Sequence, residues 1–210
     1  LSMTRIIAFF ALFLTALPAW AIEIQEVKSP GGITAWLVED RSNPIIAVSF
    51  SFLGGSTSDP AGKEGRASLL AATMDEGAGD LDSQAFQGKL EDLAIRLSFS
   101  AGRDTFSGTM RTLTRNADDA FDLLRLALTD PRFDTEPAER IRDKMLIDAS
   151  RALERPRSIL GSAFYKGLFP NDPYGNPADG TRASLAAITV DDLRAFMAEE
   201  GCACVSDLVG

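Results

Sequence analysis

The stretch GGSTSDPAGKEGRASLL, residues 54–70, decides the fold because it separates two different hydrophobic periodicities. Before it, from Pro44 to Leu53, apolar and small polar residues alternate, which is typical of a strand with one buried face. After it, apolar residues recur three and four positions apart, which indicates a helix over residues 63–76. The glycines and Pro60 favour a loop between the two elements. The sequence therefore predicts a strand, a tight loop and a packed helix in succession.

The rest of the chain extends this unit into an α+β domain. Turn residues separate the members of two pairs of apolar runs, 22–28 with 33–38 and 97–101 with 105–113. Each pair predicts a hairpin. Helical periodicity follows four capping residues: Asp82, Asn116, Thr135 and Thr189. We expect a mixed, mostly antiparallel sheet with helices packed on one face, built as a single domain over residues 22–200.

Composition excludes several classes of function. The 210 residues are 45% hydrophobic, enough for a buried core, and carry a formal net charge of -9. This charge opposes phosphate binding, so we expect no nucleic-acid partner and at most a weak preference for basic peptides. The chain contains no histidine. Serine hydrolysis of the usual kind, which needs a histidine base, is therefore excluded.

The only two cysteines, Cys202 and Cys204, lie one residue apart near the end of the sequence. They cannot connect distant parts of a fold. Two thiols without histidine also do not complete a structural zinc site, which usually takes four nitrogen or sulfur ligands. We therefore expect packing to stabilise the domain.

Residues 1–21 have the pattern of a secretory signal peptide. Arg5 is followed by an apolar run over residues 6–17 and by the small-x-small sequence Ala19-Trp20-Ala21. A membrane anchor is the alternative, but Pro18 interrupts a run that is shorter than the roughly 20 apolar residues a bilayer requires. We expect cleavage after Ala21 and a periplasmic or secreted protein.

Two separate segments share motifs with one family. Residues 54–70 resemble the strand-exit loop and first helix of the insulinase (pitrilysin) family of zinc peptidases. A second resemblance lies in Asp172-Pro173-Tyr174-Gly175-Asn176-Pro177, followed by Gly180-Thr181 and by AITVDDL at 187–193. The two motifs lie at the separation that the family requires. The resemblance covers about residues 22–200 and implies a half domain of the insulinase or mitochondrial processing peptidase type.

Active members of this family carry the zinc motif H-x-x-E-H on that first helix, with two histidine ligands and a glutamate as general base. In this chain the motif falls on residues 68–72, so its three chemical positions hold Ser68, Ala71 and Ala72. The third ligand of the family is a glutamate on a later helix, where the matching turn has Asp148 beside Ala149. A serine hydroxyl is a poor zinc ligand and alanine is none. The resemblance therefore implies a homologue without zinc, without another cofactor and without peptidase activity.

The resemblance also implies a peptide-binding strand and a partner subunit. In the family, substrate pairs with an edge strand close to the zinc helix. Ser98-Phe99-Ser100-Ala101 resembles that strand, and a plain hairpin edge without a ligand is the alternative. Our main hypothesis is an inactive subunit that completes a chamber with an active zinc peptidase subunit and helps to bind extended peptides.

Two other interpretations stay open. One is a stand-alone periplasmic module for peptide binding or assembly, and the other is a fragment of a longer peptidase-like protein. Members of the family pair two such domains, whereas this sequence holds one. Residues 201–210 also depart from the apolar core strand that follows the last helix in the family, which favours a truncated or frame-altered product.

Overall fold

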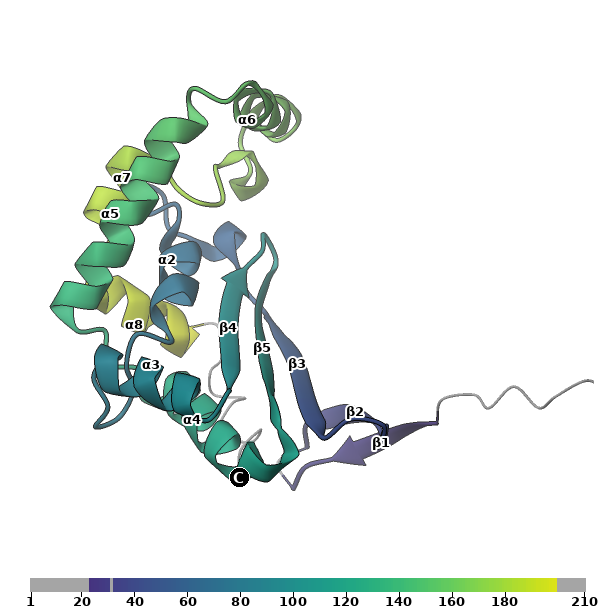
Figure 1. The fold of residues 1–210 in the computed structure, drawn as a ribbon. Helices are drawn as coiled ribbons and strands as arrows, with labels where there is room; N and C mark the ends of the chain where they lie inside the picture. Colours follow the sequence, from purple (N-terminus) through teal and green to yellow (C-terminus); the bar gives the residue numbers. More distant parts are fainter. Residues whose placement is uncertain (1–22, 31, 200–210) are drawn as a thin grey trace, which may run out of the picture.

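The structure, a computed structural model, describes residues 23–30 and 32–199. These residues form two antiparallel sheets and a layer of helices beside the larger sheet (Figure 1). The smaller sheet is the hairpin of β1 (Ile24–Lys28) and β2 (Thr34–Val38). The larger sheet has the order β3-β5-β4, formed by β3 (Ile45–Leu53), β4 (Arg96–Ala101) and β5 (Thr105–Leu113). Within the described residues, β5 is thus its central strand, and β3 and β4 are its edges.

The larger sheet has one covered and one uncovered face because successive side chains point to opposite sides. On β5, Phe106 and Met110 are buried, whereas Thr109 and Arg111 are exposed. On β3 the same alternation turns three side chains toward the core: Val48, Phe50 and Phe52. The alternation predicted for this strand is therefore confirmed.

The helix α2 (Arg66–Thr73) lies at the centre of the helical layer. It packs against β4, α5 (Thr135–Ala152) and α8 (Val190–Glu199). The other α-helices are α3 (Ser83–Asp92), α4 (Ala117–Thr129), α6 (Pro156–Leu168) and α7 (Arg182–Ala187). Three short 3-10 helices lie in the connections: η1 (Ser56–Ser58), η2 (Thr114–Asn116) and η3 (Pro173–Gly175). The expected α+β architecture with helices on one face is confirmed (Figure 1).

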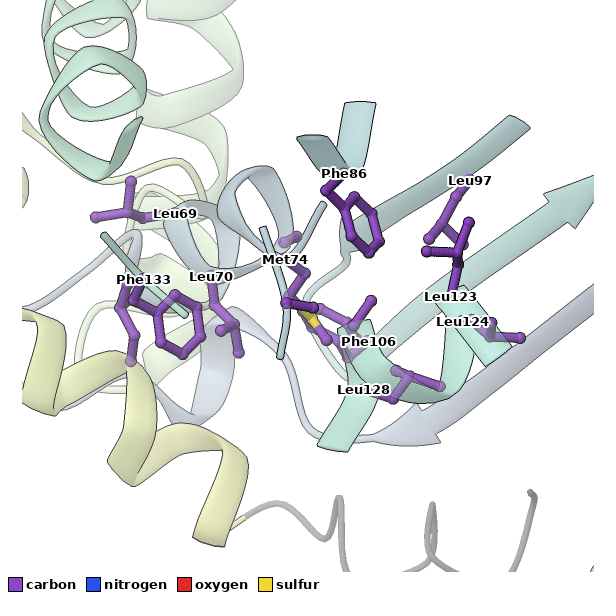
Figure 2. Packing of buried hydrophobic residues seen from close by; sticks show 14 of the residues in the cluster. Leu69, Leu70, Met74, Phe86, Leu97, Phe106, Leu123, Leu124, Leu128 and Phe133 are labelled. Carbon is purple, nitrogen blue, oxygen red and sulfur yellow. The ribbon is translucent and has the colours of Figure 1, made fainter. Parts of the chain in front are cut away.

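The hydrophobic core fills the space between α2 and the covered face of the sheet (Figure 2). Leu69, Leu70 and Met74 of this region are each at most 2% exposed. On the sheet side, Phe106 contacts the rings of Phe52, Phe99 and Phe196, with centroid distances between 6.1 and 6.3 Å. Burial of a leucine or methionine side chain contributes about 1.5–3 kcal/mol. The stability of the domain therefore depends strongly on α2.

Several details of the helices differ from the sequence-based predictions. The helix predicted over 63–76 spans Arg66–Thr73, because Gly65 before it has a left-handed φ of +93°. The predicted helix after Asp82 ends at Asp92, because Ala94 has a φ of +52° and starts the connection to β4. On α4, Phe121 is 40% exposed, and the buried residues are Ala120, Leu123, Leu124, Ala127 and Leu128.

Two predicted caps and the single sheet also need correction. Asn116 makes no capping hydrogen bond with its side chain but donates from Nδ2 to the Leu93 carbonyl at 2.6 Å. The residue before α5 is Asp134, so Thr135 is its first helical residue and not its cap. We expected one sheet, but the β1–β2 hairpin pairs only with itself among the described residues.

The predicted signal peptide and the atypical tail over 201–210 lie outside the described residues. No helix among residues 23–30 and 32–199 has both the length and the apolar content that crossing a bilayer requires.

Candidate functional site

The loop that leads from β3 to α2 is held by the turn between β4 and β5. The Gly54 and Ser56 amides donate to the carbonyls of Asp104 and Gly102 at 2.8 and 2.9 Å. Thr57 donates to the Arg103 carbonyl from its amide at 3.0 Å and from Oγ1 at 2.7 Å. A Cβ on Gly55 would lie 2.5 Å from the Gly102 oxygen, so only glycine allows this approach.

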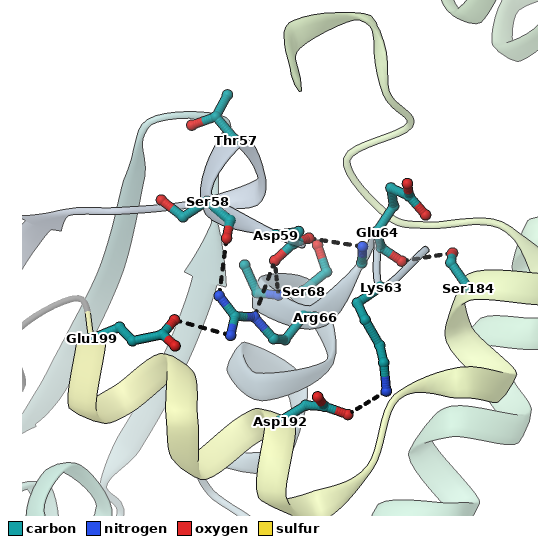
Figure 3. A network of polar contacts seen from close by, with 12 residues as sticks. Thr57, Ser58, Asp59, Lys63, Glu64, Arg66, Ser68, Ser184, Asp192 and Glu199 are labelled. Carbon is teal, nitrogen blue, oxygen red and sulfur yellow. Dashed lines mark hydrogen bonds and ion pairs between the residues drawn. The ribbon is translucent and has the colours of Figure 1, made fainter. Parts of the chain in front are cut away.

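Asp59 fixes the first turn of α2. Its carboxylate accepts the amides of Gly65 at 2.8 Å and Ala67 at 3.0 Å (Figure 3), and so satisfies two donors that the helix leaves unpaired. Burial raises the pKa of Asp59 to about 6, although the two amide hydrogen bonds and the nearby Arg66 lower it. No local pattern indicates this role, because Asp59 lies well before the helix in sequence.

Arg66 is a buried cation on α2, with only 2% of the residue exposed. Its guanidinium donates to the Ser58 carbonyl at 2.9 Å and to Glu199 at 3.1 Å, and lies 4.9 Å from the ring centre of Phe196. Its Nε is 3.7 Å from Asp59 and has no hydrogen-bond partner in the described structure. Arg66 therefore ties the loop before α2 to α8, which is a structural role (Figure 3).

The second motif of the sequence holds the opposite side of α2. Ser184 completes a capping box with Thr181 and donates to the Glu64 carbonyl at 2.8 Å. Lys63 forms an ion pair with Asp192 at 2.7 Å. Although burial raises the pKa of Asp192, hydrogen bonds from Lys63 and Thr189 bring it down to about 2. The two family motifs thus meet in space, and their contacts set the position of α2 (Figure 3).

The four predicted zinc-motif positions do not form a metal centre. Ser68 is half-buried, and its Oγ lies 3.2 Å from both the Ala178 carbonyl and Asp179 Oδ1. Ala71 is 5% exposed and packs in the core, and Ala72 follows it on the same helix. Asp148 lies on the exposed side of α5, 3.8 Å from Arg151. No group of three side chains suited to a metal ion occurs in the part of the chain that the structure describes.

The predicted peptide-binding residues Ser98, Phe99, Ser100 and Ala101 lie on the edge strand β4. Among the described strands, β4 pairs only with β5, and α2 packs against it. An open hollow of about 680 Å³ lies beside β4 and is lined by residues of the sheet and of α3. Its lining includes Arg96, Ser98, Thr109 and Arg111. The edge strand β4 therefore contacts α2 and also borders the hollow, which no residue of α2 lines.

The far end of β4 is fixed by an aromatic and arginine cluster. Arg103 in the β4–β5 turn donates to the carbonyls of Tyr174 and Asn176 at 2.8 and 3.2 Å, and its guanidinium lies 4.1 Å from the ring centre of Tyr165. The Tyr174 hydroxyl donates to Asp104, a bond that raises the pKa of Tyr174. This cluster connects the edge strand to α6 and η3. Neither hydropathy nor motif spacing indicated it.

Comparisons with known proteins agree with this geometry. No family model matches the chain. YmxG of Helicobacter pylori (strain ATCC 700392 / 26695), described as a non-peptidase homolog, is 27% identical over 172 residues, which are 82% of this chain and 39% of YmxG. An inactive peptidase M16 domain from Pseudomonas fluorescens is similar in structure, with a TM-score of 0.79 and 26% identity, covering 84% of this chain and 43% of that chain.

Pitrilysin itself has the same fold, with a TM-score of 0.74 over 87% of this chain and 20% of pitrilysin, at 18% identity. The chain spans less than half of the length of each of these three proteins. The fold and the missing zinc ligands define a peptidase-like domain without a peptidase centre. In sequence and in fold, the chain is thus similar to a protein described as a non-peptidase homolog and to an inactive peptidase M16 domain.

Proposed function

We propose that this domain binds extended peptides along β4 and forms one wall of a peptide chamber together with a zinc-bearing insulinase-family subunit. The observation that carries the proposal is the position of β4, an edge strand beside α2 and an open hollow. An edge strand presents main-chain donors and acceptors that an extended peptide can complete. Because α2 keeps its place but lacks the zinc ligands, the domain would contribute binding and no bond cleavage.

An exposed apolar surface supports the pairing with another subunit. The helix α6 buries none of its residues. Leu160, Phe164 and Leu168 on it are 71%, 58% and 57% exposed. Exposed apolar surface of this kind is typical of protein interfaces. The export of the protein to the periplasm, suggested by residues 1–21, belongs to the same proposal.

A peptide-binding measurement tests the role of β4. We expect a fluorescently labelled extended peptide to bind the purified protein, and the same peptide with N-methylated backbone amides to bind at least about tenfold more weakly, because methylation removes the donors that pair with a strand edge. Fluorescence anisotropy gives both affinities. Equal affinities would show that the peptide does not pair with a strand.

Affinity capture from the native cell envelope tests the partner. We expect the tagged protein to recover a subunit with an H-x-x-E-H motif. Recovery of peptides without such a subunit would favour the alternative, a stand-alone binding module.

A further inference from the structure

Two arginines face each other on the uncovered side of the larger sheet. In the antiparallel pairing of β4 with β5, Arg96 lies directly opposite Arg111, and Ala47 of β3 lies opposite Arg111 on its other side. Both arginines are exposed. Like charges that are direct neighbours across two strands destabilise a sheet. A chain with a net charge of -9 thus places two cations side by side where packing does not require them.

No carboxylate of the described residues neutralises this pair. Neither Arg96 nor Arg111 takes part in any of the ion pairs or side-chain hydrogen bonds found in that part of the chain, whereas Arg66, Arg132 and Arg140 each have an acidic partner. Glu91 of α3 lines the same hollow but makes no ion pair with either arginine. The other side chains on this face are mainly hydroxyls, such as Ser49, Ser98 and Thr109. These groups can donate hydrogen bonds to an anion.

We infer that the β4 edge selects extended peptides that carry an acidic side chain, held by Arg96 with Arg111 behind it. This inference rests on the proposed peptide binding along β4. A peptide strand paired with β4 would put the side chain opposite Arg96 on the uncovered face, within about 5 Å between Cβ atoms. A glutamate there would meet two guanidinium groups, which bind carboxylates with strong charge-assisted hydrogen bonds. This local preference is the opposite of the weak preference for basic peptides that net charge suggests.

Two matched peptides test the inference. They have the same extended, otherwise neutral sequence and differ only in one central residue, glutamate or glutamine. We expect the glutamate peptide to bind the full chain about fivefold more tightly, the upper range for an exposed ion pair, with a difference that decreases as salt increases. Arg96→Gln should reduce this ratio to about one. Arg111→Gln should reduce it partly. A third peptide, with lysine at the same central position, should bind the Arg96→Glu variant more tightly than the glutamate peptide does.

Arg157→Gln is the control, because Arg157 is an exposed arginine on α6, away from β4. It should leave the ratio unchanged. Equal binding of the two peptides to the unmodified chain would overturn the charge preference and leave the proposed function standing. An equal loss in Arg157→Gln would also overturn it, because the effect would then follow overall charge. Failure of both peptides to bind would refute the proposed function, and the preference with it.

Discussion

The small side chains at the predicted zinc-motif positions leave α2 well packed. Ser68, at the first ligand position of the family, bonds to the loop over residues 178–179. Ala71 is buried in the core, where the carboxylate of a general base would need compensating partners. Alanine is also the best helix former. These residues explain how the helix is retained without the chemistry that the family performs on it.

Asp59 makes the stability of the domain depend on pH. Burial raises the pKa of its carboxyl from 3.8 to about 6 in the folded chain, so the folded state binds this proton more tightly than the unfolded state does. The protonated Asp59 carboxyl therefore stabilises the folded state fully below about pH 4, and this stabilisation is lost as the pH rises through about 6. We expect the free energy of unfolding of the natural chain, relative to Asp59→Asn, to fall by about 2 kcal/mol from pH 4.5 to 7.

Urea denaturation at a series of pH values measures this difference. Asp122→Asn is the control for the loss of one carboxylate, because the Asp122 side chain is 73% exposed on α4. A difference between the natural chain and Asp59→Asn that stays constant or grows with pH would show that the burial of Asp59 does not set its pKa.

At the scale of elements, the contact between the two family motifs holds α2 in place. Gly65 and Gly180 both have left-handed φ angles, +93° and +79°. A Cβ on Gly65 would lie 2.9 Å from the Asp179 oxygen and from the Gly180 Cα, and a Cβ on Gly180 would overlap the Glu64 carbonyl oxygen. The start of α2 and the start of α7 therefore approach as closely as backbone allows.

Gly180→Ala should be strongly destabilising. It adds a steric overlap to the strain of a left-handed residue, so we expect a loss of about 2–4 kcal/mol in the free energy of unfolding. Gly62→Ala is a matched control, because Gly62 has the same φ of +79° but nothing within 4 Å of its added Cβ. It should lose only about 1 kcal/mol. Chemical denaturation of both variants compares the two values, and equal losses would contradict the role of the close contact.

The sequence predicted the elements well where one periodicity was uninterrupted. Both hairpins and the alternation along β3 follow from local pattern. In an antiparallel hairpin the residue numbers of two opposite positions add to a constant, so the predicted hairpin could also have revealed that Arg96 lies opposite Arg111. The predicted start of α2 was wrong, because Gly65 and the distant residue Asp59 decide where the helix begins. The burial of Arg66 also depends on α8, more than 120 residues later. Such long-range contacts leave no local pattern.

The β1–β2 hairpin is the least protected element of the described structure. All of its strand residues are exposed, and Trp36 is 79% exposed. A two-stranded hairpin without a packed face is marginally stable in water. We expect amide hydrogens of β1 and β2 to exchange at least about 100-fold faster than those of the central strand β5. Hydrogen exchange with mass spectrometry measures both, and equal protection would show that another surface covers the hairpin.

At the scale of the whole molecule, the chain combines a peptidase-like fold with predicted zinc-motif positions that hold no histidine or glutamate. The inactive Pseudomonas domain and pitrilysin share this shape, at TM-scores of 0.79 and 0.74. The fold alone therefore does not distinguish a domain described as inactive from pitrilysin. Binding along β4 and pairing with a zinc-bearing subunit are what this scaffold would still offer.

Titration of the purified chain with Zn²⁺ in a calorimeter tests this claim most directly. The measurement should use the variant with Cys202→Ser and Cys204→Ser, so that the two thiols cannot bind the metal. The additional changes Ser68→His and Ala72→His provide a comparison with two histidine ligands at positions i and i+4. We expect no stoichiometric binding at micromolar Zn²⁺ without the histidines, and measurable binding with them. One zinc ion bound tightly per chain without the histidines would contradict the account.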